Sequence, residues 1–189
     1  MQYVFSQYLL TYFDSRPKLQ GFITTHSHEV VRGAKLSQLR VLRKVDSFKC
    51  TLYDLRSFHN NLEGAPELLD FYNYFYAISF PDIIFADKVI LYEGDTERML
   101  INSLLKLDQT PFPNLKSQYL SFVQVGGAYA VSYEPILKYL DIKSLIISDI
   151  DYGKDSNVIN EIEASESTND SINKLLTLSQ VFRVTNVEF

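Results

Sequence analysis

The sequence has a single cysteine, no long apolar segment and no excess of positive charge. Cys50 alone excludes an internal disulfide framework, which fits a reducing compartment. No run of about 18 apolar residues occurs, and the first residues lack the basic start of a secretory signal, so we expect a cytoplasmic protein without a membrane-spanning segment. The net charge of −5 argues against a basic protein that wraps nucleic acid. It leaves open a DNA enzyme whose acidic site works through bound cations, because the charge of a metal reverses the local sign.

The composition is that of an ordinary globular protein with one substantial core or two small units. Of the 189 residues, 46% are hydrophobic and 22% are charged. In the first half, the apolar spacing predicts a helix over residues 2–13. A buried strand is expected over 22–25 and a further strand over 38–45. Residues 46–65 are polar and are expected to be irregular, with a break at 64–66.

The second half alternates between strands and helices. Residues 66–80 have a helical period and many aromatic rings. A core or interdomain helix is favoured over a face that stacks on nucleic acid, because no basic residues lie between the rings. The next predicted elements are strands at 88–93, 119–125 and 144–151, and helices at 95–107 and 132–140. This order is typical of an α/β fold with a parallel sheet that helices cover on both faces.

Acidic residues follow two of the predicted strands. Glu93 ends the first, and Asp149 and Asp151 end the third. In an open α/β sheet, ligands bind outside the carboxyl ends of the strands. Side chains two residues apart in a strand share a face, so the two aspartates point the same way. If the two strands are neighbours, three carboxylates converge, and oxygen ligands of this kind call for a compensating Mg²⁺ or Mn²⁺.

Glu97, in the first turn of the helix after Gly94, is a fourth candidate ligand. Gly94 is expected to let the chain turn sharply, which would bring Glu97 to the same edge of the sheet. Each of these acids also has a plain structural interpretation. Glu97 would complement the helix dipole, and the Asp-Ile-Asp sequence would cap a loop. The residues alone leave both interpretations open.

Three motifs in order resemble a known family: "FADKVILYEGDTERMLI", "VQVGGAYA" and "LIISDID". They are similar to the Toprim domain of topoisomerases and primases, and more closely to that of the OLD (overcoming lysogenization defect) family of ATP-dependent endonucleases. The resemblance covers about residues 84–151. It implies a Toprim-type parallel sheet flanked by helices. It also implies that Glu93, Glu97, Asp149 and Asp151 bind one or two Mg²⁺ or Mn²⁺ ions and carry out metal-dependent cleavage of DNA.

The resemblance extends toward the start of the chain. The stretch "GFITTHSHEV" resembles the end of an ABC-type ATPase domain, where His26 takes the place of the switch histidine that senses the γ-phosphate of ATP. No G-x-x-x-x-G-K-[ST] motif is present, so ATP is expected only in a full-length context. The resemblance implies the C-terminal part of a longer protein, with an ATPase remnant at 1–45, a helical connector at 46–83 and a Toprim domain at 84–189 that lacks a downstream segment.

The implied partners are DNA, and a second copy of the chain or the ATPase portion, in phage defence or DNA processing. Two other interpretations compete with the endonuclease. One is a catalytically incomplete Toprim module that binds metal or a partner without cutting. The other is a phospho-acceptor receiver domain, which also gathers acids at strand ends. Receivers place the paired acids after the first strand and a single acid after the third, the reverse of the order here, so this interpretation ranks last.

Overall fold

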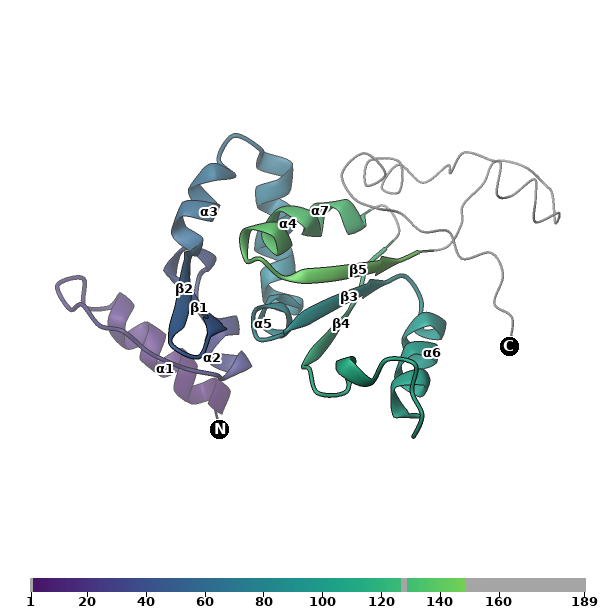
Figure 1. Cartoon of the computed structure of the whole chain (residues 1–189). Helices are drawn as coiled ribbons and strands as arrows, with labels where there is room; N and C mark the ends of the chain where they lie inside the picture. Colours follow the sequence, from purple (N-terminus) through teal and green to yellow (C-terminus); the bar gives the residue numbers. More distant parts are fainter. Residues whose placement is uncertain (1, 127–128, 149–189) are drawn as a thin grey trace. The chain divides into compact units, whose positions relative to one another are not determined.

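The computed structural model describes residues 2–126 and 129–148 of the chain, which divide into two compact units (Figure 1). Within the described residues, unit 1 consists of 2–89, 118–121 and 136–143. Unit 2 consists of 90–117, 122–126, 129–135 and 144–148. Among the helices of this part of the chain, none is both long and apolar enough to cross a bilayer.

Three short elements open unit 1: the helices α1 (Gln2–Asp14) and α2 (His28–Gly33) and the 3-10 helix η1 (Leu36–Gln38). The helix expected over 2–13 is confirmed. The strand expected over 22–25 is wrong, because residues 20–27 form neither helix nor strand and Phe22 is almost fully exposed. An apolar run becomes a strand only where a neighbour satisfies its backbone, and none of the described strands pairs with this segment.

A β-hairpin and a helix follow: β1 (Arg40–Asp46), β2 (Lys49–Asp54) and α3 (Leu55–Asn61). β1 confirms the strand expected over 38–45, whereas the irregular segment expected over 46–65 is wrong. β2 pairs with β1 in an antiparallel register that places Leu42 opposite Leu52. Asp54 then ends β2 and caps α3, because its Oδ1 accepts a hydrogen bond from Arg56 N at 2.8 Å.

Aromatic side chains of the helices α4 (Pro66–Ile78) and α5 (Phe80–Ile84) build the core of unit 1. Pro66 begins α4, as the predicted break at 64–66 requires. Tyr72 and Phe75 are buried, and the ring of Phe58 in α3 packs edge-on against Tyr72 with centroids 5.2 Å apart. The prediction that these rings belong to a core is therefore confirmed.

A three-stranded sheet has β3 at its centre. Its strands are β3 (Lys88–Tyr92), β4 (Leu120–Gln124) and β5 (Lys143–Ile147), in the order β4-β3-β5. β3 and β4 are parallel, since Asp87 N donates to Tyr119 O at 2.9 Å at one end and Val125 N donates to Tyr92 O at 2.8 Å at the other. The connections contain α6 (Asp95–Lys106), η2 (Pro113–Leu115) and α7 (Ala130–Tyr139). The α/β class with a parallel sheet flanked by helices is confirmed.

Burial differs between the centre and the edge of this sheet. Residues 89–92 of β3 are buried, whereas 143–145 of β5 are exposed. In α6, the apolar residues Ile101, Leu104 and Leu105 are only half-buried. The central strand is thus the rigid element of the sheet, and its carboxyl end, in unit 2, is where the predicted acids begin.

Burial raises the pKa of two tyrosines. The hydroxyl of Tyr76 in α4 donates to Val31 O, and burial holds the pKa of Tyr76 well above its ordinary value. Burial also raises the pKa of Tyr133 in α7 to about 12. The folded protein therefore keeps protons that the unfolded chain releases near pH 10. The resulting stability is fully present below about pH 10 and is lost as the pH rises above it.

We predict that Tyr76→Phe lowers the free energy of unfolding near neutral pH by about 1 kcal/mol, because the hydrogen bond to Val31 is lost. The variant should lose less additional stability above about pH 10 than the wild type, because it has one proton fewer to release. Tyr74→Phe, in the same helix but with an exposed side chain, is the matched control and should change neither quantity. Denaturant unfolding at the two pH values measures both effects. An equal alkaline loss in Tyr76→Phe and wild type would contradict the assignment.

Candidate functional site

The candidate site begins where β3 leaves the core. Residues 89–92 are buried and Glu93, which follows them, is half-buried. Two hydrogen bonds from the end of β4 hold the backbone there: Val125 N donates to Tyr92 O at 2.8 Å, and Gln124 Nε2 donates to Glu93 O at 3.3 Å. The Glu93 carboxylate therefore has a defined position at the carboxyl end of the central strand.

Ser148 joins the end of β5 to Glu93. β5 is a direct neighbour of β3, which is the arrangement that convergence of the predicted acids requires. Ser148 is the first residue after β5, and its hydroxyl donates to Glu93 Oε2 at 2.7 Å. A hydrogen bond of this length to a carboxylate is of the strong, charge-assisted kind. It fixes the Glu93 side chain relative to the end of β5.

Glu97 approaches the same turn from α6. Its Oε2 accepts a hydrogen bond from Gly94 N at 3.0 Å, so the carboxylate caps the first turn of the helix. Gly94 has a φ of −124°, a backbone conformation that any residue adopts, so a sharp turn is not the reason for glycine here. A Cβ on Gly94 would lie 3.0 Å from Glu97 Oε2. Glycine therefore gives the carboxylate room to approach the backbone.

Glu93 and Glu97 present carboxylate oxygens on either side of Gly94. Such oxygens are the donors that Mg²⁺ and Mn²⁺ prefer, so the chemistry of this donor pair fits a hard divalent cation. Within residues 2–126 and 129–148, no three His, Cys, Asp or Glu side chains gather closely enough to hold a metal ion. Asp149 and Asp151 lie outside the described residues. The convergence of three or four carboxylates therefore stays a prediction.

His26 lies in unit 1, in the segment that leads into α2. It is exposed, and its ring centroid is 6.3 Å from that of Phe85. His28 packs closer to Phe85, at 4.9 Å, and its Nε2 lies 3.5 Å from Asp82 Oδ1. Residues 24–29 line a shallow, open depression. His26 is thus accessible to a ligand, and its role as a switch histidine stays a prediction.

Comparisons with known proteins match the segment that contains β3. The family model described as "Overcoming lysogenization defect protein-like, TOPRIM domain" matches residues 84–151. This segment is an OLD-like TOPRIM domain. Endonuclease GajA from Bacillus cereus (strain HuB5-5) is 26% identical over 99 residues, which cover 49% of this chain and 14% of GajA. The family resemblance of the three motifs is thereby confirmed.

The matched family has a coarse functional class. TOPRIM domains of the OLD-like family are of the metal-dependent nuclease type. TOPRIM domains generally bind divalent metal ions. The oxygen donors of Glu93 and Glu97 agree with that requirement.

Ser148 and Gln124 contact Glu93 in this part of the TOPRIM domain, but neither is among the site residues predicted from the sequence. Ser148 follows an apolar strand as Glu93 does, so its place at the same edge could have been inferred once β3 and β5 were taken as neighbours. Gln124 uses its side chain to hold a backbone carbonyl. The sequence carries no signal for such a contact, because any amide or cationic side chain could make it.

We predict that Glu97→Ala speeds hydrogen exchange of the Gly94 amide and destabilises the start of α6 by about 0.5–1 kcal/mol, because the cap is lost. Glu97→Gln should retain most of the protection, since the Gln side-chain oxygen can accept the same hydrogen bond. Thr96→Ala, an exposed neighbour in α6, is the control and should leave the Gly94 amide unchanged. NMR hydrogen exchange measures the effect. Unchanged exchange in Glu97→Ala would show that the cap does not form in solution.

Proposed function

We propose that this chain is the nuclease part of an OLD-type ATPase-nuclease, and that it breaks phosphodiester bonds of DNA with the help of divalent metal ions. The observation that carries the proposal is the hydrogen bond from Ser148 Oγ to Glu93 Oε2, at 2.7 Å. It joins the carboxyl end of β5 to that of β3. In the proposal, Asp149 and Asp151 continue from Ser148 along the same edge of the sheet as Glu93.

Glu93, Glu97, Asp149 and Asp151 would hold one or two Mg²⁺ or Mn²⁺ ions. When bound, such ions neutralise the scissile phosphate and stabilise the leaving oxygen. The described half of this set supports the proposal, because Glu93 directly precedes Gly94, Glu97 accepts a hydrogen bond from the Gly94 amide, and both offer hard oxygen donors.

The residues around the acids orient them before any ligand arrives. Ser148 engages one oxygen of Glu93, and the Gly94 amide engages one oxygen of Glu97. Each carboxylate is therefore restricted in its rotation. A side chain that is already restricted loses less freedom when it binds a ligand, which favours binding in a single geometry.

The remaining parts of the proposal concern the longer protein. Residues 1–45 would be the end of an ABC-type ATPase, 46–83 a connector and 84–189 the TOPRIM domain. His26 would contact the γ-phosphate of ATP once the rest of the ATPase is present. A second copy or the ATPase portion would be the protein partner, in phage defence or DNA processing. The support is the sequence resemblance of 21–30 and the match to endonuclease GajA.

The test is incubation of the chain with supercoiled plasmid and Mg²⁺ or Mn²⁺. We expect nicking that falls to background in Glu93→Gln and Asp149→Ala, because each loses a proposed ligand. Asp108→Ala removes an exposed acid of unit 2 and should nick like the wild type. Nicking that survives in Glu93→Gln and Asp149→Ala would overturn the assigned site. Metal binding by calorimetry without nicking would instead identify a catalytically incomplete TOPRIM module.

Ser148→Ala is predicted to weaken Mn²⁺ binding by about tenfold or more, because loss of a hydrogen bond that orients a ligand typically has this effect. Ser148→Thr keeps the hydroxyl and should restore the affinity. Ser144→Ala, on the exposed start of β5, is the matched control. Titration calorimetry with Mn²⁺ measures the affinity independently of cleavage. Wild-type affinity in Ser148→Ala would show that this hydroxyl does not position Glu93.

A further inference from the structure

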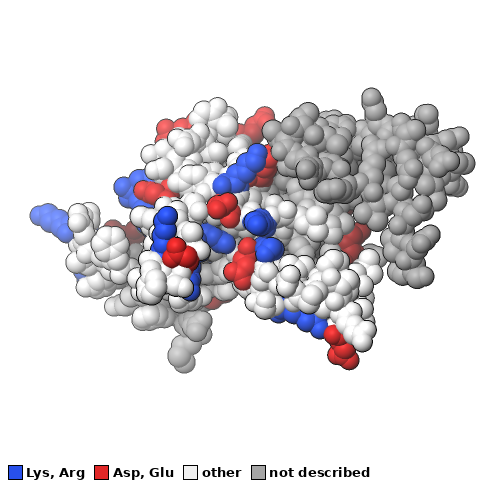
Figure 2. All heavy atoms as spheres, viewed as in Figure 1, with Lys and Arg blue, Asp and Glu red and all other residues white. Residues whose placement is uncertain are grey.

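Residues 32–56 carry a local positive charge in an acidic protein. They contain two Asp and seven Lys or Arg, a net charge of +5, whereas the whole chain has −5. The seven cations are Arg32, Lys35, Arg40, Arg43, Lys44, Lys49 and Arg56. In Figure 2, Lys and Arg atoms lie over the part of the view where Figure 1 draws β1 and β2, with acidic atoms between them. A charge of this sign and density favours a polyanionic partner.

Three of the seven cations serve the structure of unit 1. Arg32 and Arg40 form ion pairs with acids of the same unit, at 2.8 Å and 3.1 Å. Arg43 Nη1 donates to Ala86 O at 3.1 Å and so fixes β1 to the chain that leads into β3. Arg40 thus links β1 to β2 and Arg43 links β1 to the chain before β3, whereas Arg32 pairs within α2.

The other four cations are Lys35, Lys44, Lys49 and Arg56, all of them exposed. In the part of the chain that the structure describes, none of the four takes part in an ion pair. Lys44 and Lys49 lie near the tip of the hairpin, one on each strand, whereas Lys35 and Arg56 lie beside its base. A seven-residue strand spans about 20 Å. The cations are therefore spread along the hairpin.

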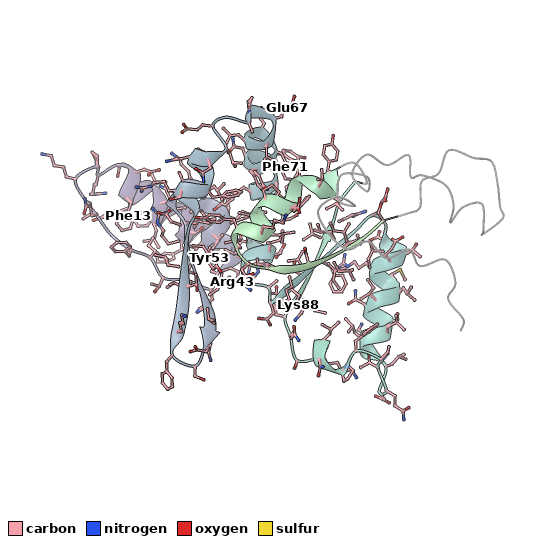
Figure 3. The ribbon with its side chains drawn as sticks, turned by 45° about the horizontal axis from the view of Figure 1, so that its top comes forward. Phe13, Arg43, Tyr53, Glu67, Phe71 and Lys88 are labelled. Carbon is pink, nitrogen blue, oxygen red and sulfur yellow. The ribbon has the colours of Figure 1, made fainter. Side chains whose placement is uncertain are left out.

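The tip of the hairpin carries an aromatic ring. Phe48 lies in the turn between β1 and β2 and is fully exposed. Asp46 Oδ1 accepts a hydrogen bond from Phe48 N at 2.9 Å, which orders the turn around the ring. Figure 3 shows the two strands extending beyond the helices of unit 1. An exposed phenyl ring between two lysines is costly in water, and a partner that covers it removes that cost.

We propose that the hairpin β1–β2 binds duplex DNA, with Lys44 and Lys49 on backbone phosphates and Phe48 in contact with the groove. The choice of DNA among polyanions rests on the proposed function. A two-stranded antiparallel ribbon has the width to enter the major groove, which is about 12 Å wide. Lys44 lies opposite Cys50 and Lys49 lies opposite Asp46, so each lysine contacts a phosphate from its own strand of the ribbon.

A protein partner is the competing occupant. Leu42 and Leu52 lie opposite each other and are 69% and 58% exposed, which would suit an apolar surface. Such a partner would have to be acidic as well, since it would cover Lys44 beside this pair. A DNA duplex carries phosphates along its whole length and can neutralise cations that are spread along the hairpin, so the charges favour DNA.

The first test is the affinity of the chain for a short labelled duplex, measured by fluorescence anisotropy in EDTA so that no cleavage occurs. The variant is Lys44→Gln with Lys49→Gln, and the matched control is Lys106→Gln with Lys143→Gln, which removes the same charge from exposed sites elsewhere. We expect the hairpin variant to bind about tenfold or more weakly near 100 mM salt. The slope of log affinity against log salt should fall by about 2, because each phosphate contact contributes about 0.9. Phe48→Ala should weaken binding without changing this slope.

Cys50 provides a second readout, because it is the chain's one cysteine, is exposed, and lies opposite Lys44 in the hairpin. Duplex DNA should slow alkylation of Cys50 by a maleimide in the wild type and in the control variant. It should not slow alkylation in the Lys44→Gln, Lys49→Gln variant. Circular dichroism establishes that each variant is folded.

Several outcomes would overturn the proposal: no DNA binding by the wild type at low salt, equal weakening in the two double variants, or Cys50 left unprotected by bound DNA. An acidic protein that protects Cys50 where DNA does not would assign the hairpin to that protein instead.

The measurements in EDTA are independent of cleavage. Hairpin-dependent binding without any nicking in Mg²⁺ or Mn²⁺ would leave this inference standing and overturn the proposed nuclease function. If the wild type nicks DNA and the hairpin variant binds DNA as tightly as the wild type, the nuclease proposal stands and the hairpin proposal is overturned.

Discussion

The hydrogen bond between Ser148 and Glu93 joins residues 55 positions apart in the chain. It forms because β5 lies directly beside β3, and β4 lies on the other side of the same central strand. From one side Gln124 holds the carbonyl of Glu93, and from the other Ser148 holds its carboxylate. A buried strand supplies the rigid base for these contacts, since residues 89–92 cannot shift without disturbing the core. The position of the first acid is therefore a consequence of strand order.

The structural and functional interpretations of Glu97 are compatible. As a cap, it uses Oε2 to accept the Gly94 amide hydrogen bond. A carboxylate has a second oxygen, and a hard cation can bind it while the cap persists. The cap also restricts the side chain near the end of β3. Glycine at position 94 leaves space for this carboxylate, because a Cβ there would lie 3.0 Å from Glu97 Oε2.

Long periodic segments were predictable, and segments that depend on a partner were not. The helix at 2–13 and the strand at 88–93 follow from apolar spacing, which local sequence carries. The segment 22–25 is equally apolar but has no described strand beside it, whereas the polar β2 is a strand because β1 pairs with it. The same distinction holds at the site. Glu93 could be inferred from the end of an apolar strand, but the contact of Ser148 depends on sheet order.

The net charge of an acidic protein does not determine whether a polyanion binds to one part of its surface. At physiological ionic strength, charges separated by more than about 8 Å are largely screened. A phosphate at the tip of the hairpin therefore interacts mainly with the charges near it, which are Lys44, Lys49 and Asp46. Residues 32–56 carry +5 and the remaining residues carry −10. The proposed acidic site repels DNA until it binds cations, so the proposed nuclease needs its positive charge concentrated on a separate element. The hairpin meets that requirement, since Arg40 and Arg43 of β1 make structural contacts and Lys44 and Lys49 stay exposed.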